Sequence, residues 1–405
     1  MCGGARGVVV SVEFPAGRTE PPVRTVSPAP TEPPSPPARP ASSARPRPSA
    51  LVRVATAVVV VVGLVFGVYA AVSGASLRTE PAGPAGAPAV PVPAAPAWAP
   101  VDRPGPALTA PAADLTASLV CTRGQANRDT VLLLSGTGAD PDTAFRWGLR
   151  PLLASEGFPT CLSTAPDANT GDIARRAEYV VHAIRTIAER TGRKVAVVGH
   201  SQGGMVPRWA LRFWPDVRDR VSDLVALGPT NAGSDALRAG CARGCSAAFW
   251  QQSSGSRFEE ALNSERRTFA GVDYTVVVST GDTVVTPEPQ ASALPAEPGG
   301  GAVAGNGAIA VQDVCPGRTV EHGPLGLSDA VSFALVVDAL RNPGPADPAR
   351  IAASTCKRTQ AQGITSAELR QGTAAVDRAL TRSAATAAVL PAEPDLPCYT
   401  RPTPC

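Results

Sequence analysis

The sequence predicts one large α/β domain in the C-terminal part of the chain, with a mostly parallel sheet and helices on both of its faces. Two observations lead to this prediction. From about residue 113 onward, short apolar β-branched runs alternate with segments of helical periodicity, which is typical of a parallel sheet covered by helices. Before that point, proline-rich tracts flank one long apolar segment and leave little material for a second core.

The strands are predicted from short apolar runs that end in turn residues, and the helices from apolar residues that recur on one face. The predicted strands cover residues 131–136, 194–199, 221–228, 274–280 and 308–314, and the predicted helices cover residues 144–157, 171–192 and 205–213. The helix at 171–192 has the clearest periodicity, and Gly192 stands where a C-terminal cap belongs. The long segment between the third and fourth strands is expected to form a cap over the site.

Residues 54–77 contain no charged residue, and about twenty helical residues at ~1.5 Å each span a ~30 Å hydrocarbon core. Arginines without an intervening acidic residue precede this segment between positions 39 and 53. The positive-inside rule therefore predicts a cytoplasmic N-terminus and an exported C-terminal domain. We interpret the segment as an uncleaved signal anchor in the cell membrane. The alternative is a signal peptide, cut at the small residues 73–76, which would release a secreted protein.

The tracts on either side of the apolar segment have too little apolar periodicity to build a core. We expect a disordered cytoplasmic Pro/Arg-rich tail at residues 1–53, an extended Pro/Ala-rich linker at 78–112 and the catalytic domain at 113–405. The net charge of +3 is too small to indicate nucleic acid as a partner, and we expect a monomer.

The cysteine pattern agrees with export. Of the nine cysteines, eight follow the apolar segment, and none of them forms a C-x-x-C pair. With only three histidines in the chain, this pattern favours up to four disulfides over a metal site. The eight are Cys121, Cys161, Cys241, Cys245, Cys315, Cys356, Cys398 and Cys405.

The candidate nucleophile is Ser201, in a Gly-x-Ser-x-Gly turn between a predicted strand and a predicted helix. Gly199 and Gly203 flank the serine where a sharp turn leaves no room for side chains, and the helix offers the free backbone N–H of Gln202. Such a match arises by chance in an Ala/Gly-rich chain. It therefore needs a base, an acid and an oxyanion hole in a compatible order.

Elimination among the three histidines selects His322 as the base. His182 lies on the polar face of its helix. His200 precedes the serine, and its side chain is expected either to line the mouth of the pocket or to have no role. His322 follows the last predicted strand, at the sheet edge where reactive groups gather.

Asp282 follows the strand at 274–280 directly and is the candidate acid that would orient the imidazole. Asp273 precedes that strand and belongs to the opposite edge, while Glu288 and Asp313 are weaker competitors. Thr137, in the glycine-rich turn after the first strand, can offer its backbone N–H and its hydroxyl to developing negative charge.

These features together resemble the α/β-hydrolase lipases typified by Candida antarctica lipase B and its bacterial relatives, from about Cys121 to the C-terminus. The resemblance rests on LLLSGTG, SQGG followed by RWALRFWPDVRDRVSDLVAL, FWQQSSGS, STGDTVVTP, QDVC, EHGPL and EPDLPCYTRP. It implies an α/β-hydrolase fold and a Ser201–Asp282–His322 triad. It also implies Thr137 and Gln202 as oxyanion donors.

The resemblance further implies Gln252, Val284 and Val285 as pocket-lining residues. Two positions depart from the family, since His200 stands where a tryptophan is usual and Thr230 where an aspartate is usual, so substrate preference does not transfer. The implied disulfides are Cys121–Cys161, Cys315–Cys356 and, with a displaced first cysteine, Cys398–Cys405. Parity alone adds Cys241–Cys245.

The expected function is that of an exported serine ester hydrolase, a lipase or carboxylesterase, which acts on acyl-ester or lipid substrates without metal or organic cofactor. Two alternatives stay open at this point. An envelope acyltransferase would use the same triad with a different acceptor, and a catalytically inactive surface module would bind without reacting.

Overall fold

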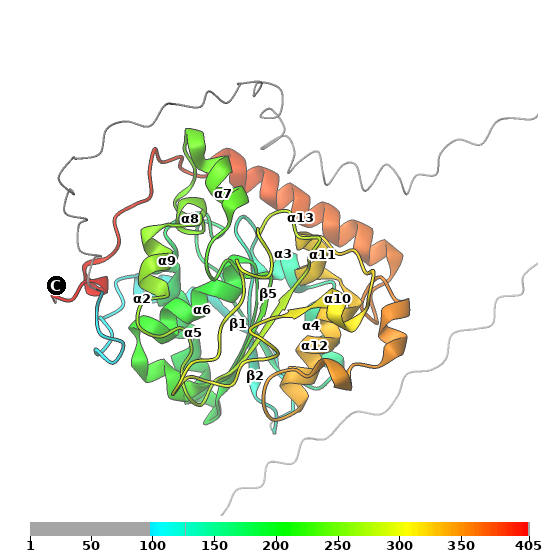
Figure 1. Ribbon diagram of the computed structural model, residues 1–405. Coiled ribbons are helices and arrows are strands. Elements are labelled where there is room, and N and C mark those ends of the chain that lie inside the picture. Colours follow the sequence, from blue (N-terminus) through cyan, green and yellow to red (C-terminus); the bar gives the residue numbers. More distant parts are fainter. Residues whose placement is uncertain (1–97, 126, 404–405) are drawn as a thin grey trace, which may run out of the picture. The chain divides into compact units, whose positions relative to one another are not determined.

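The structure is a computed structural model that describes residues 98–125 and 127–403 (Figure 1). Across these residues we find no helix with the length and apolar character needed to cross a membrane. The expected cytoplasmic tail at residues 1–53 and the expected anchor at 54–77 lie outside the described residues.

A seven-stranded sheet, ordered β1-β3-β2-β4-β5-β6-β7, forms the centre of the domain. All neighbouring strands pair in parallel except β1, which runs antiparallel to β3. The predicted α/β class and its mostly parallel sheet are therefore confirmed. The strands are β1 (Leu119–Cys121), β2 (Thr130–Leu134), β3 (Thr160–Ser163), β4 (Val195–His200), β5 (Val221–Leu227), β6 (Asp273–Val278) and β7 (Ile309–Ala310).

Helices cover both faces of this sheet, as Figure 1 shows with α5 and α6 on one side and α10 and α12 on the other. The α-helices are α2 (Ala112–Ala117), α3 (Pro141–Phe145), α4 (Leu149–Ser155), α5 (Ile173–Thr191), α6 (Gln202–Phe213), α7 (Asp235–Gly240), α8 (Ala247–Gln251), α9 (Arg257–Leu262), α10 (Val311–Val314), α11 (His322–Leu327), α12 (Ala330–Arg341) and α13 (Ser366–Thr386). Short 3₁₀ helices are η1 (Pro215–Arg220), η2 (Cys241–Arg243), η3 (Pro348–Arg350), η4 (Ala353–Lys357) and η5 (Cys398–Thr400).

Residues 131–134 of strand β2 are all apolar because of where they pack. Its side chains alternate between two cores, with Leu132 and Leu134 packed in the core that contains α5 and α6, and Val131 and Leu133 packed in the core that contains α4 and α12. Because both faces of the strand are buried, neither set of positions tolerates polar residues. The sheet is thereby fixed in register, and its carboxyl edge becomes the platform for the loops described below.

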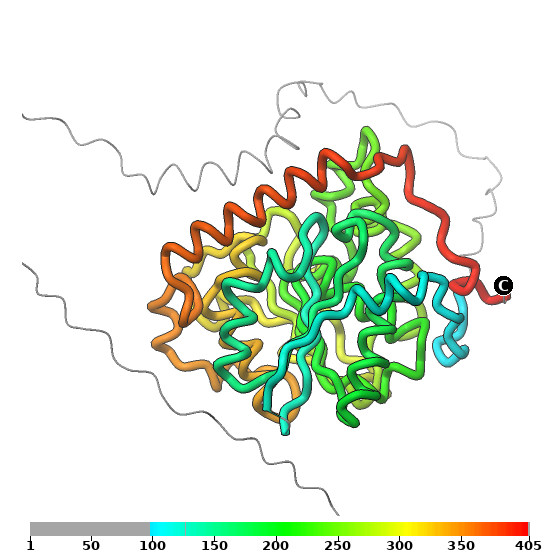
Figure 2. The backbone as a smooth tube through the Cα atoms, turned by 180° about the vertical axis from the view of Figure 1, so that it is seen from behind, coloured from blue at the N-terminus to red at the C-terminus, as the bar shows by residue number. Residues whose placement is uncertain are grey.

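The cap is the segment between β5 and β6, which carries α7, α8 and α9. It is tied to the segment after α13 by a pair of backbone hydrogen bonds between Cys245 and Leu390. Helix α13 lies on the same side of the domain as α7 and α8 in both views (Figures 1 and 2). Its Ser383 hydroxyl donates to the carbonyl of Gly138 at 2.8 Å, so this helix also supports the glycine-rich turn after β2.

Three expectations for the secondary structure and boundaries are wrong. The predicted strand at 308–314 pairs only over Ile309–Ala310 and then turns into α10, where the Asp313 carboxylate accepts from the Ala310 N–H. The predicted helix at 144–157 is broken between α3 and α4 at Gly148. A Cβ at Gly148 would lie 2.7 Å from the carbonyl oxygen of Leu327, so the chain passes too close there for a regular helix with a side chain.

The third correction concerns residues 98–112, which the sequence assigns to the extended linker. These residues pack against the domain instead. The Ala99 N–H donates to the carbonyl of Thr400 at 2.8 Å, and the Trp214 indole donates to that of Pro106 at 2.9 Å. The Ala110 N–H reaches the buried carboxylate of Glu178 on α5, also at 2.8 Å. The ordered body of the domain therefore begins at least fifteen residues earlier than predicted.

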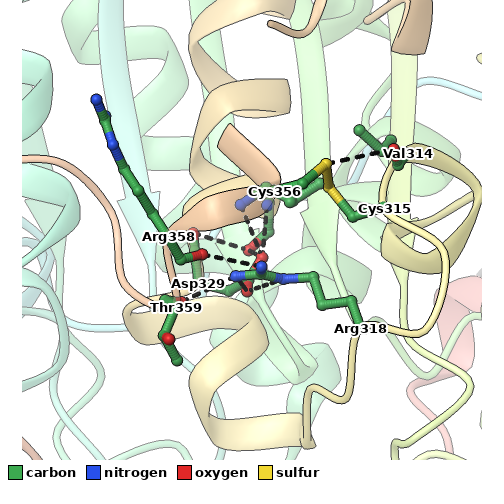
Figure 3. The surroundings of a disulfide bond; sticks show 9 residues. Val314, Cys315, Arg318, Asp329, Cys356, Arg358 and Thr359 are labelled. Carbon is green, nitrogen blue, oxygen red and sulfur yellow. Dashed lines mark hydrogen bonds and ion pairs between the residues drawn. A yellow bond between two sulfur atoms is a disulfide. The ribbon is translucent and has the colours of Figure 1, made fainter. Parts of the chain in front are cut away.

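A disulfide and a buried ion pair close the segment between β7 and α12 (Figure 3). Cys315 is bonded to Cys356 in η4, and the nearly buried Arg318 pairs with the buried Asp329. Asp329 also caps α12, since its Oδ1 accepts from the second and third N–H groups of that helix at 2.9 Å. His322 lies between Arg318 and Asp329 in the sequence, so this ion pair joins the two ends of the segment that carries it.

We predict that Arg318→Met lowers the free energy of unfolding by about 3–5 kcal/mol, because Asp329 would keep a buried charge without its partner. Chemical denaturation measures this change. Arg193→Met, which breaks the more exposed pair with Asp129, serves as the matched control and is expected to cost no more than ~1 kcal/mol. Equal losses in the two variants would contradict the assignment of Arg318–Asp329 as the stabilising contact of the loop.

Candidate active site

Ser201 occupies a strained turn between β4 and α6. Its backbone has φ 57° and ψ −128°, a conformation that costs a non-glycine residue about 1–3 kcal/mol. A Cβ at Gly199 would lie 2.0 Å from the carbonyl oxygen of Gly203, and a Cβ at Gly203 would lie 2.0 Å from that of Leu134. Glycine is therefore needed on both sides of the serine, because any side chain there would collide with the backbone. The turn presents the serine side chain at the carboxyl edge of the sheet.

His322 and Asp282 meet at the same edge. Nδ1 of His322 lies 2.6 Å from Oδ2 of Asp282, and the carboxylate group is fully buried. Its other oxygen accepts the N–H groups of Val284 and Val285 at 2.8 and 2.9 Å. Burial by itself would raise the pKa of Asp282, but the nearby His322 and these hydrogen bonds outweigh it and hold the pKa below its usual value. The carboxylate is thus ionised and aimed at the imidazole.

Ser201 and His322 both border the end of β5. The Ser201 N–H donates to the carbonyl of Leu227 at 2.9 Å, and a Cβ on the next residue, Gly228, would lie 3.3 Å from Cε1 of His322. Within residues 98–125 and 127–403, no hydrogen bond joins the Ser201 hydroxyl to the imidazole. In hydrolases without substrate this bond is often long and tightens when the substrate arrives. The structure therefore gathers the three predicted residues at one edge, with the serine–histidine bond open.

The competing residues lie elsewhere. Asp273 begins β6 at the opposite end of the strand, and Asp313 is exposed and caps α10. His182 lies on α5, where its ring is next to Thr186. None of these three side chains is hydrogen-bonded to His322.

Glu288 is close to Asp282 but is engaged as a neutral acid. Its Oε1 lies 2.5 Å from Oγ of Ser292, and the same hydroxyl lies 2.6 Å from the carbonyl oxygen of Pro229. A carbonyl only accepts, so the serine proton is directed there and the carboxyl group must donate its own proton to the serine. In agreement, burial raises the pKa of Glu288 to about 8. Glu288 is therefore unsuited to be the acid of the triad.

His200 does not stand at an open pocket mouth as expected. Its side chain is 7% exposed, its ring centroid lies 4.7 Å from that of His322, and its Nε2 lies 3.0 Å from the His322 carbonyl oxygen. Burial, followed by the proximity of His322, lowers the pKa of His200 to about 3. A neutral imidazole has one proton, and the carbonyl contact places it on Nε2. His200 thus braces the main chain of the residue proposed as the base.

The glycine-rich turn after β2 lies beside Ser201. A Cβ at Gly136 would be 3.0 Å from the serine Cβ and 3.5 Å from its Oγ, so the turn and the hydroxyl are neighbours. The hydroxyl of the next residue, Thr137, is contacted by the side-chain amides of Gln202 at 3.0 Å and Gln252 at 2.9 Å, both through Nε2. The two glutamines come from α6 and from the end of α8 in the cap.

These two contacts fix the direction of the Thr137 hydroxyl. Each Nε2 donates, so the threonine oxygen accepts twice and its own proton is left to donate to a third group. The orientation of Gln252 is set by Thr230, whose hydroxyl donates to Oε1 of that amide at 3.1 Å. Because Gly136 places the turn against Ser201, the free donor of Thr137 is available beside the nucleophile.

Of the predicted pocket residues, Thr230 and Gln252 are fully enclosed and belong to this hydrogen-bond network. Val285 is completely buried, and its N–H helps to hold Asp282. Val284 is partly exposed, and its carbonyl accepts from the Ser234 hydroxyl at 2.6 Å. A role for these residues in acyl or alcohol selection stays a prediction.

Three of the expected disulfides are present. Cys121–Cys161 joins β1 to β3, Cys241–Cys245 closes a short loop of the cap, and Cys315–Cys356 fastens the loop that carries His322. For the fourth pair, Cys398 is disulfide-bonded, while Cys405 lies outside the described residues.

Two buried residues near the candidate site, Arg176 and Asn169, were not predicted from the sequence. Arg176 lies on the buried face of α5, and its guanidinium donates to Oε1 of Gln202. The Asn169 side chain donates to Oγ of Ser135 and to the carbonyls of Gly136 and Ala139, so it holds the glycine-rich turn from beneath. The signal for Arg176 was available, since a charged residue stands among the apolar positions of the clearest predicted helix.

The chain is similar to known proteins both in sequence and in structure. A family model described as a PGAP1-like alpha/beta domain matches residues 164–236. Lipase B of Pseudozyma antarctica is 30% identical over 312 residues, which cover 73% of this chain and 87% of the relative. The crystal structure of Aspergillus fumigatus lipase B is similar with a TM-score of 0.67 at 28% identity, and the match covers 77% of each chain.

We predict that His200→Gln makes stability less sensitive to acid. The buried imidazole stays neutral down to about pH 3, whereas in the unfolded chain it takes up a proton near pH 6.5. Its contribution is therefore complete above pH 6.5 and is lost as the pH falls toward 3, by up to about 1.4 kcal/mol per pH unit. Glutamine keeps a donor for the His322 carbonyl but does not titrate.

Chemical denaturation of both proteins at several values between roughly pH 7 and pH 4 measures the difference in slope. His182→Gln, which removes a less buried histidine, is the control and is expected to change the slope less. Identical pH dependence in wild type and His200→Gln would show that His200 is not held neutral.

Proposed function

This chain belongs to the lipase B family of α/β-hydrolases, and as its particular function we propose that it cleaves acyl esters through an acyl-enzyme formed on Ser201. The family makes it a lipase-like carboxylic ester hydrolase. The observation that carries the finer proposal is the 2.6 Å hydrogen bond between His322 and Asp282, at the same sheet edge as the strained serine turn.

In the proposed reaction, Oγ of Ser201 attacks the ester carbonyl while His322 takes the serine proton. Asp282 fixes the imidazole by its Nδ1–H and stabilises the cation that forms. The imidazolium then protonates the departing alcohol, and the ester carbon stays bonded to the serine. Water attacks this acyl-enzyme in the second half, with His322 again moving the proton, and the carboxylic acid leaves.

The negative charge that develops on the carbonyl oxygen needs donors placed in advance. We assign this role to the backbone N–H of Gln202 at the start of α6 and to the backbone N–H and hydroxyl of Thr137. Support comes from the hydroxyl of Thr137, which accepts from two buried amides and has its own proton free. Gly136 supports it as well, because its close approach to Ser201 brings the turn next to the reacting oxygen.

We also propose that the enzyme works outside the cytoplasm. Disulfides are stable in oxidising compartments, and the cap, the sheet edge and the His322 loop each contain one. The apolar segment at residues 54–77 supports a membrane anchor as the means of export, which remains a prediction from the sequence.

We predict that Ser201→Ala lowers kcat for a short-chain nitrophenyl ester by roughly 10⁵- to 10⁶-fold, because no other group replaces the nucleophile. Asp282→Asn is expected to lower kcat by roughly 10⁴-fold while leaving KM nearly unchanged. Ser155→Ala removes an exposed hydroxyl far from the sheet edge and is the matched control.

The measurement uses the purified full chain, a series of acyl-chain lengths and a phosphonate that labels reactive serines. Adding candidate alcohols and measuring the ratio of transfer to hydrolysis separates a hydrolase from an acyltransferase. Full activity in Ser201→Ala, or phosphonate labelling that persists in that variant, would refute the assignment of Ser201.

A further inference from the structure

Arg176 is a charged residue in an otherwise apolar environment. It lies on α5 three positions after Ile173 and four before Val180, both fully buried, and its own exposure is 5%. The guanidinium donates through Nη2 to the carbonyl of Ser135 at 2.8 Å and through Nη1 to Oε1 of Gln202. The side chain therefore reaches from the helix to the base of the glycine-rich turn.

The partners of this cation are neutral. One is a main-chain carbonyl and the other a side-chain amide, and burying a charge against neutral groups is unfavourable compared with an ion pair. Burial lowers the pKa of Arg176 to about 9, against the opposing effect of Asp167, and the group remains protonated at neutral pH. Arg176 supplies hydrogen bonds to two buried acceptors, but these need donors and not a positive charge, so we looked for a role of the guanidinium in the site.

The amide of Gln202 links Arg176 to Thr137. Its Oε1 accepts from Arg176, so its Nε2 faces the opposite way and donates to the Thr137 hydroxyl at 3.0 Å and to the carbonyl of Asn169 at 2.9 Å. The two ends of an amide differ only in donor and acceptor character, and neighbouring groups decide which end faces which way. Arg176 only donates and the Asn169 carbonyl only accepts, so the two groups together select this orientation of Gln202.

The reversed orientation of Gln202 would redirect the Thr137 hydroxyl. Without Arg176, the Ser135 carbonyl loses its donor and competes with the Asn169 carbonyl for Nε2, which can then turn into the space that the guanidinium now occupies. Oε1 would then face Thr137 as an acceptor and take the hydroxyl proton. That proton would no longer be free to donate beside Ser201.

We propose that Arg176 is a positioning residue for the oxyanion hole: it holds Gln202 in the one orientation that leaves the Thr137 hydroxyl free to donate to the developing oxyanion. The proposal rests on the proposed function of Ser201 and Thr137. Arg176 does not touch the reacting atoms and acts only through the amide of Gln202.

The test compares an ester with its thionoester, whose sulfur is a poor hydrogen-bond acceptor and gains little from the hole. Arg176→Met is expected to lower kcat/KM for the ester roughly 10- to 100-fold, somewhat less than the loss of a whole donor, and to lower it far less for the thionoester. Thr137→Val removes the hydroxyl and provides the reference for this ratio.

The decisive measurement is the double-mutant cycle. In the Thr137→Val background, Arg176→Met is expected to change the ester rate no more than about twofold, because the group through which it acts is gone. Additive losses in the two backgrounds, or equal losses for ester and thionoester, would overturn the proposal and leave Arg176 with a structural role.

Two further variants keep the test independent of folding and of the proposed function. Arg176→Lys keeps a buried charge but lacks the planar fork that reaches Ser135 and Gln202 together. It is expected to reduce the ratio of ester to thionoester rates by a factor between those of wild type and Arg176→Met. Arg212→Met removes another buried arginine, which is hydrogen-bonded to Ala99 and Ser264, and is expected to lower the melting temperature without changing the ratio.

If wild type shows no ester hydrolysis that Ser201→Ala abolishes, the proposed function fails together with this inference. Normal hydrolysis with an additive cycle refutes the role of Arg176 alone.

Discussion

The close approach of three backbone segments at the Ser201 turn is the constraint on which the site depends. The turn folds back so tightly that no Cβ fits at Gly199 beside the Gly203 carbonyl, and it passes so near to the end of β2 that no Cβ fits at Gly203. This contact brings the chain after β2 next to Ser201, and α6 begins directly after it, so the proposed donors of Thr137 and Gln202 are placed by the same packing. Strain at Ser201 is thereby held by β2 and β4, two neighbouring strands that are buried on both faces.

Around this turn the polar groups are buried in defined protonation states. His200 is a neutral donor to the main chain of His322, and Glu288 is a neutral acid that donates to Ser292. Asp282 is instead ionised, because hydrogen bonds and the imidazole offset its burial. Of these three groups only Asp282 carries a charge, and it is the one hydrogen-bonded to the His322 imidazole.

The sequence predicted the fold class because it depends on local patterns of apolar runs and turn residues. Local patterns of the same kind, glycines in a turn and polar residues after strands, indicated the candidate residues that the structure gathers at one sheet edge. It did not predict the break at Gly148, since that depends on a contact with Leu327, which is remote in the chain. For the same reason it misassigned His200, whose role follows from a ring contact across the site, and it overlooked Arg176. The spacing of residues along the sequence does not show which polar groups become buried against partners that are distant in the chain.

The packing of residues 98–112 has a practical consequence for how the domain is handled. A recombinant fragment that begins at residue 113 would expose the Trp214 indole and leave the carboxylate of Glu178 without its main-chain donors. A fragment that begins at residue 98 retains both contacts and the hydrogen bond between Ala99 and Thr400. A backbone hydrogen bond therefore joins the two ends of the folded domain. A fragment made for crystallisation should begin before Trp98.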